Sequence, residues 1–128
     1  MSNNSEETMN EQPQELYIDV KKVSEELRIR PEVYLKIVKS FANSLMQKMN
    51  ALSDALAVED REQARMILHE IKGTSSNLRL HNVSQAEGII HAAVKSGAGR
   101  DQLDKHFEAL RKEAERLQQY VYKLTGDA

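Results

Sequence analysis

A single histidine in the middle of the chain has the neighbours that covalent chemistry on its ring would need. His69 is followed three residues later by Lys72 and then by Gly73. Successive residues of a helix are turned by about 100° around its axis. In that arrangement six mostly apolar residues near His69 lie within about 60° of one direction and form a stripe, and His69 lies about 160° from the centre of this stripe. This stripe consists of Ala64, Ile67, Leu68, Ile71, Ser75 and Leu78. The pattern therefore predicts a helix that exposes His69 to solvent.

The three residues suit the transfer of a phosphoryl group. Imidazole is largely neutral and nucleophilic near pH 7, because its reference pKa is about 6.5, and it forms covalent intermediates. A phosphoryl group on His69 would add close to two negative charges, and Lys72, one turn along, is placed to compensate them. Glycine costs roughly 1 kcal/mol relative to alanine inside an exposed helix. We therefore expect Gly73 to serve a purpose other than folding, namely to let another protein approach the ring.

The segment from His69 to Leu78, HEIKGTSSNL, resembles the H-x-x-K-G-(S/T)-S box of histidine-containing phosphotransfer domains, the four-helix phosphocarriers of multistep phosphorelays. The resemblance extends over about residues 18 to 124. It implies a shuttle in which His69 accepts a phosphoryl group from the aspartate of one receiver domain and passes it to the aspartate of another. Lys72 would then neutralise the charge of the phosphoryl group, and Gly73 would give the receiver access to the ring.

A second helix is expected to contribute to the same site. With Ile90 at the centre of its buried stripe, His91 lies about 100° and Lys95 about 140° round that helix. By position, these two resemble the family's polar residue that approaches the active imidazole and the basic residue that helps to hold the phosphoryl group. The alternative for His91 is an ordinary histidine on the flank of a helix. Other residues on the same face as His69 are also candidates. Arg65 and Ser76 are expected to support the site, and Met66, Gly73 and Ser76 are expected to contact the partner protein.

Periodic apolar residues predict an all-α fold, an antiparallel up-down-up-down four-helix bundle with a short N-terminal extra helix. Helix starts are marked by Asp19, Pro31, Asp60 and Asn82, the last two each followed three residues later by glutamine. Arg79 stands where the family's box usually ends in a glycine, so the helix is expected to continue or turn differently there. Residues 1–16 are expected to form a disordered leader and residues 17–128 the bundle domain. The expected helices span about 20–27, 31–58, 61–80, 83–96 and 101–124.

Composition excludes several kinds of site. The 128 residues include no cysteine and have a formal net charge of −2, so disulfides and thiolate sites are excluded and no basic stripe is available for nucleic acid. No two of the four histidines are three or four residues apart, which argues against a metal site on a helix. No apolar run is long enough to cross a membrane, and no nucleotide-binding loop is present. We therefore expect a cytoplasmic monomer without a metal, cofactor or ATP site of its own. By the resemblance, its partners are response-regulator receiver domains or a hybrid sensor kinase, and the receiver supplies Mg²⁺.

Two other functions fit parts of the pattern. His69 followed by Glu70 also begins like the phosphoacceptor box of a sensor histidine kinase, in which the neighbouring acid assists attack on ATP. That box normally continues into a threonine-proline kink, whereas Lys72 and Gly73 follow here, and a kinase hairpin needs a dimer to complete its core. The third possibility is a helical adaptor without covalent chemistry, for which replacing His69 would change no activity.

Overall fold

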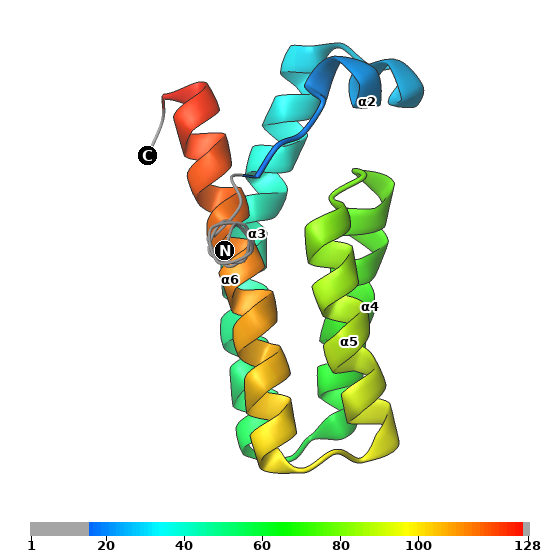
Figure 1. Ribbon diagram of the computed structural model, residues 1–128, viewed down its shortest axis with the longest axis vertical. Helices are drawn as coiled ribbons and strands as arrows, with labels where there is room; N and C mark the ends of the chain where they lie inside the picture. The colour runs from blue at the N-terminus through cyan, green and yellow to red at the C-terminus, as the bar shows by residue number, and fades with distance from the viewer. Residues whose placement is uncertain (1–15, 127–128) are drawn as a thin grey trace, which may run out of the picture.

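The computed structural model describes residues 16–126, and every regular element within that range is a helix (Figure 1). The all-α prediction is thus confirmed for this part of the chain. The expected leader, residues 1–16, lies outside the described residues except for Leu16. The helices are α2 (Val20–Leu27), α3 (Pro31–Ala57), α4 (Arg61–Asn77), α5 (His81–Ser96) and α6 (Arg100–Thr125).

Three of the four expected helix starts are confirmed. The Asp19 side chain accepts a hydrogen bond of 3.1 Å from the Lys22 amide at the start of α2. Asp60 does the same for α4, where it accepts from the Gln63 amide at 3.0 Å. Pro31 is the first residue of α3, where its fixed φ angle favours a helix and its missing amide hydrogen leaves no donor unpaired.

The boundary between α4 and α5 differs from the prediction. The prediction that α4 extends to Leu80 is wrong, because α4 ends at Asn77 in a tight turn in which Arg79 adopts a left-handed φ of 62°. The Arg79 amide donates to the Ser76 carbonyl at 3.1 Å, and the Leu80 amide donates to the Ser75 carbonyl at 2.8 Å. This pair of bonds is the Schellman ending, and it satisfies carbonyls that the end of the helix leaves open.

The expected cap of α5 by Asn82 is also wrong. The helix begins at His81, and the cap position is occupied by the buried Leu80, which makes no side-chain cap hydrogen bond. The Ser84 amide instead donates to the Leu80 carbonyl at 3.1 Å. Because the turn at residues 78–80 leads straight from one helix into the next, Asn82 already lies in the first turn of α5.

The four long helices surround one core. Each of α3, α4, α5 and α6 packs against the helix before or after it in the chain, α6 closes the ring against α3, and α2 packs on α3 at one end (Figure 1). The largest fully buried side chains come from all four helices: Tyr34, Leu45, Leu52, Leu68, Ile71, Ile90, Leu110 and Leu117. A ring of this kind leaves each long helix with one outer face, on which a functional side chain is accessible.

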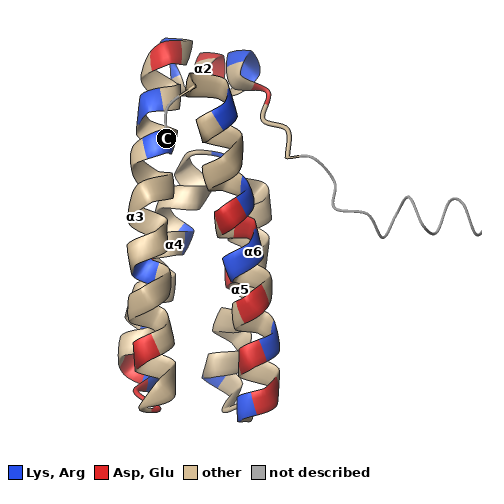
Figure 2. Ribbon diagram, turned by 90° about the vertical axis from the view of Figure 1, so that its left-hand side faces the viewer, with Lys and Arg blue, Asp and Glu red and all other residues tan. Residues whose placement is uncertain are grey.

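Acidic and basic residues alternate along much of α6 (Figure 2). Arg111, for example, forms ion pairs with Glu108 and Glu115 on the same helix. Ion pairs between side chains that remain partly open to solvent contribute little to stability. None of the helices in the described range is both long enough and apolar enough to span a membrane.

Candidate functional site

His69 lies on the outer face of α4. All six residues of the predicted stripe, Ala64, Ile67, Leu68, Ile71, Ser75 and Leu78, are buried, with at most 7% of their surface exposed. His69 lies on the opposite side of the helix and is exposed. The helix therefore directs its apolar residues into the core and the imidazole into solvent, as the sequence pattern predicts.

Gly73 has no packing reason to be a glycine. A Cβ atom built on it would meet no other atom within 4 Å, and the residue is exposed on α4 one turn after His69. Lys72 beside it is exposed as well. A patch of bare backbone therefore lies next to the ring, and a lysine lies within one turn of it.

Two contacts define how α4 lies against α5. Near one end, the hydroxyl oxygens of Ser75 and Ser84 are 2.8 Å apart, and near the other the Arg61 guanidinium donates to the Val94 carbonyl at 3.0 Å. The first contact joins the last turn of α4 to the first turn of α5, and the second joins the first residue of α4 to the last turn of α5. Between these contacts, the register places His91 of α5 within about one helical turn of the level of His69.

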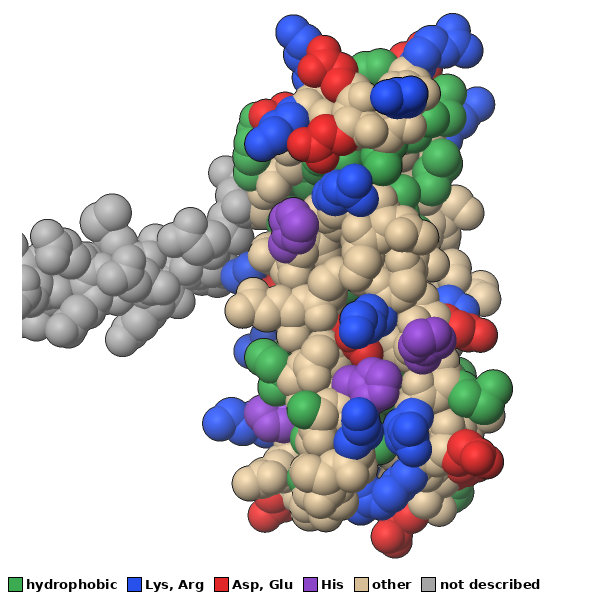
Figure 3. All heavy atoms as spheres, turned by 90° about the vertical axis from the view of Figure 1, so that its right-hand side faces the viewer, with side chains coloured by type: hydrophobic (Ala, Val, Ile, Leu, Met, Phe, Trp, Pro, Cys, Tyr) green, Lys and Arg blue, Asp and Glu red, His purple; other side chains and the backbone are tan. Residues whose placement is uncertain are grey.

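His69 and His91 line one open hollow. The other lining residues are Glu62, Arg65, Met66 and Glu70. Two of the predicted residues, Arg65 and Met66, therefore line the same hollow as His69. The other predicted residues do not line it: Lys72, Gly73, Ser76 and Lys95. Figure 3 shows the face over α4 and α5, on which histidine and basic side chains lie close together. The structure thus brings residues of two helices to one surface around the exposed imidazole of His69.

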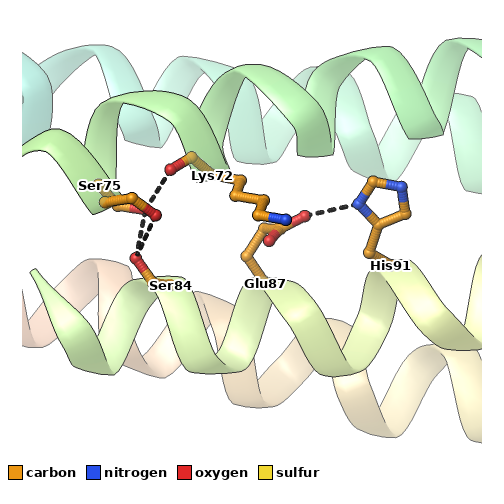
Figure 4. Close-up of polar contacts among 6 residues, drawn as sticks. Lys72, Ser75, Ser84, Glu87 and His91 are labelled. Atoms are coloured by element: carbon orange, nitrogen blue, oxygen red, sulfur yellow. Dashed lines mark hydrogen bonds and ion pairs between the residues drawn. The ribbon is translucent and has the colours of Figure 1, made fainter.

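Glu87 of α5 is a residue that the sequence reasoning missed. It is fully buried, and its Oε2 lies 2.8 Å from Nδ1 of His91, four residues later on the same helix (Figure 4). Its other carboxyl oxygen, Oε1, has no hydrogen-bond partner among the described residues. The available signal was a carboxyl group three residues before Ile90, on the stripe that faces the core. A buried acid at such a position requires a partner.

A family model of the Hpt domain matches residues 36–120, which is more than half of the chain and includes the whole of α4 and α5. This chain belongs to the Hpt domain family. The resemblance that the box at His69 indicated is thereby confirmed. Hpt domains carry out histidine phosphotransfer in phosphorelays. Comparisons with curated proteins and with solved structures give no significant match.

The cations of this Hpt domain are available to an incoming anion. Arg65, Lys72 and Lys95 are exposed, and none of them forms an ion pair with a residue in the described range. The acid beside His69 is already engaged, because Glu70 lies 3.0 Å from Nζ of Lys48 on α3. An added phosphoryl group would therefore meet positive groups that have no competing partner.

The remaining polar candidates hold α4 and α5 together. Ser76 is exposed and its hydroxyl lies 3.3 Å from that of Ser84, while the buried Ser75 also donates to the Lys72 carbonyl at 3.3 Å. Figure 4 shows the Lys72 side chain extending from α4 toward α5.

Within residues 16–126, no cluster of three or more His, Asp or Glu side chains is placed to hold a metal ion.

Proposed function

We propose that this Hpt domain is a phosphorelay intermediate in which His69 accepts a phosphoryl group from a receiver aspartate and passes it to the aspartate of another receiver. The supporting observation is the arrangement on α4: an exposed imidazole opposite a buried stripe, with a lysine and an open glycine within one turn. The matched family supports the same chemistry.

The transfer step requires one bond to form as another breaks. A ring nitrogen of His69 uses its lone pair to attack the phosphorus of the aspartyl phosphate. The N–P bond forms, the P–O bond to the aspartate breaks, and the bonding electrons leave on the aspartate carboxylate. The second transfer reverses these steps on the other receiver. Such reactions depend on positioning and on neutralising charge rather than on further covalent help from the protein.

Lys72 is the main residue for charge neutralisation, with Arg65 and Lys95 in support. Each is exposed and has no ion-pair partner among the described side chains, so turning toward a phosphoryl group breaks no existing pair. His91 is proposed to contact the ring of His69 across the hollow that the two residues line. No cofactor, metal or ATP site is proposed for this chain, since the receiver brings its own acidic cluster and Mg²⁺.

The receiver docks on the outer face of α4. Met66 is 57% exposed, and with Gly73 and Ser76 it forms a small, weakly polar surface that flanks the histidine. The basic side chains nearby attract an acidic receiver surface, which raises the rate of encounter more than the affinity. We propose the receiver of a response regulator or of a hybrid sensor kinase as the partner, without nucleic acid or membrane contacts, in the cytoplasm.

The finer description of the fold is part of the same proposal. We assign residues 17–128 to one domain, with an antiparallel up-down-up-down arrangement of α3, α4, α5 and α6. Contacts between residues far apart in the sequence support this arrangement. The Tyr34 hydroxyl donates to the Leu78 carbonyl at 2.7 Å, and the Arg100 guanidinium donates to the Leu56 carbonyl at 3.2 Å.

A specific contact disfavours the sensor-kinase alternative. In that alternative the acid that follows the histidine assists the attack on ATP, but Glu70 forms an ion pair with Lys48 of α3. Its carboxylate is therefore drawn toward the α3 side of α4. The kinase alternative also predicts a dimer, which sedimentation equilibrium would detect.

The central test is phosphorylation of His69. The chain is mixed in turn with each receiver domain of its host, every receiver having been phosphorylated with radiolabelled acetyl phosphate. We expect one phosphoryl group on the chain, labile in acid and stable in base, and no label in His69→Gln. Because His69 is exposed, this substitution should leave the helical content unchanged in circular dichroism. Label that persists in the variant, or no label from any receiver, would refute the proposed function, and the second result would favour the helical adaptor.

A further inference from the structure

The buried pair of Glu87 and His91 goes beyond what phosphotransfer on His69 requires. We propose that Glu87 is a positioning residue, which fixes the tautomer and orientation of His91 so that His91 can orient the ring of His69. The inference rests on the proposed function and adds to it a second layer of residues behind the nucleophile.

Burial of the carboxyl group is the first observation. Glu87 is fully buried between the helices, and Oε1 has no hydrogen-bond partner in the described part of the chain. A carboxyl group without full compensation is costly in such a place, and an apolar side chain of similar size is often as stabilising or more so. Folding therefore gives no reason for an acid at this position, and its hydrogen bond with His91 is the feature to explain.

That contact determines where His91 holds its proton. Glu87 Oε2 lies 2.8 Å from Nδ1 of His91, and a carboxylate can only accept a hydrogen bond. The proton of the neutral ring is therefore held on Nδ1, and Nε2 keeps its lone pair. Figure 4 shows the second ring nitrogen of His91 directed toward α4, the helix that bears His69. The same arrangement, a carboxylate that fixes a histidine which in turn acts on a nucleophile, recurs in catalytic triads.

With its lone pair free, Nε2 of His91 can accept a hydrogen bond from the N–H of His69. This fixes the proton of His69 on the nitrogen nearest His91 and leaves the other nitrogen bare for attack on phosphorus. No proton leaves either ring during the step. The phosphorylated ring of His69 gains a positive charge as the N–P bond forms, and its N–H remains hydrogen-bonded to His91.

The tautomer of His91 can be measured without any transfer reaction. Long-range proton–nitrogen NMR spectra at mildly alkaline pH distinguish protonated from bare ring nitrogens. In the wild-type chain we expect the His91 proton on Nδ1, and in Glu87→Leu we expect it to move mainly to Nε2. Glu87→Gln, which keeps an acceptor oxygen, should restore the wild-type pattern. A proton on Nε2 in the wild type, or no change in Glu87→Leu, would overturn the inference.

The effect on function is measured by a double-mutant cycle. Loss of one positioning hydrogen bond should slow phosphotransfer to His69 by about tenfold in Glu87→Leu. The same substitution should have no further effect in a His91→Ala background, because it acts through His91. Glu113→Leu on α6 is the matched control, since Glu113 also has a buried oxygen without a partner and lies outside the hollow. It should leave the rate unchanged.

The outcomes separate this inference from the proposed function. If the wild type is phosphorylated on His69 and Glu87→Leu reacts equally fast, the inference fails and the proposed function stands. Equal slowing by Glu87→Leu in both backgrounds also refutes it, because that result indicates a general structural effect. If the wild type accepts no phosphoryl group, the proposed function fails, while the NMR spectra still decide whether Glu87 sets the tautomer of His91.

Discussion

Gly73 lowers the helix propensity of α4 at a place where nothing in the bundle requires a small residue. The space beside it is open, since an added Cβ would have no neighbour within 4 Å. Its backbone is ordinary helix, because the only positive φ angles of described glycines are those of Gly97 and Gly126. Neither close packing nor backbone geometry therefore accounts for the glycine, and we propose that it gives a partner access to His69.

Substitutions at Gly73 should separate stability from transfer. Gly73→Ala is expected to raise the free energy of unfolding by about 1 kcal/mol, since alanine is the better helix former and its methyl group meets no atom. Gly73→Glu should keep the helical content but block phosphotransfer, because its side chain and charge occupy the docking surface beside His69. Urea unfolding and transfer assays measure the two effects.

Thr74→Glu is the matched control for the added charge. Thr74 is exposed on the same helix, but it lies about 140° round from His69. This variant should transfer normally. Normal transfer by Gly73→Glu, or a loss of stability in Gly73→Ala, would remove the docking explanation for the glycine.

At the scale of the element, α4 shows what its own sequence determines and what the rest of the fold decides. Its buried stripe was predicted correctly, because the period of a helix places those residues on one side. Its end was not, because Arg79 adopts a left-handed conformation that favours glycine. Contacts from elsewhere accompany that turn. Arg79 forms an ion pair with Glu26 of α2 at 3.6 Å, and the Tyr34 hydroxyl of α3 donates to the Leu78 carbonyl. Both contacts join residues that are far apart in the sequence, so the sequence of α4 alone does not predict them.

Tyr34 should make the stability of the bundle depend on alkaline pH. Burial raises the pKa of Tyr34 to about 12, Tyr120 adds to the rise and Arg79 opposes it. In the unfolded chain a tyrosine titrates near pH 10. Between about pH 10 and 12 the unfolded state thus loses a proton that the folded state keeps, so the stabilisation present below pH 10 is lost as the pH rises.

Tyr34→Phe should lower the free energy of unfolding by about 1 kcal/mol at neutral pH, because the hydrogen bond to Leu78 is lost. Its stability should then fall less steeply than that of the wild type from about pH 10 to 12, as measured by urea unfolding at a series of pH values. Tyr122→Phe, at a residue 50% exposed, controls for loss of a phenol and should follow the wild type. Parallel curves for Tyr34→Phe and the wild type would contradict the assignment.

Across the whole molecule, the position of a side chain could be predicted from the sequence where it depends on one helix alone, and less well where it depends on the packing of several helices. His69, Lys72 and Gly73 were found because one helix and its period suffice to place them. The pair of Glu87 and His91 was not found although its spacing of four residues is local, because the buried stripe of α5 was predicted from its apolar residues alone. His91 was predicted to lie near His69 from its angle on the helix and from the family resemblance, and the packing of the two helices provides the shared hollow.

The closed ring of helices predicts the oligomeric state. Each of α3, α4, α5 and α6 packs between two others, so the side chains of the core are covered within one chain and no second copy is needed to bury them. A kinase phosphoacceptor hairpin must instead dimerise to cover its core. We therefore expect sedimentation equilibrium to give the monomer mass of 14.6 kDa over a wide range of concentration. Leu124→Lys, at an apolar side chain that is 48% exposed near the end of α6, should leave that mass unchanged. A mass twice as large would contradict the monomer and would favour the kinase fragment, whereas a monomer that is phosphorylated on His69 excludes both alternatives.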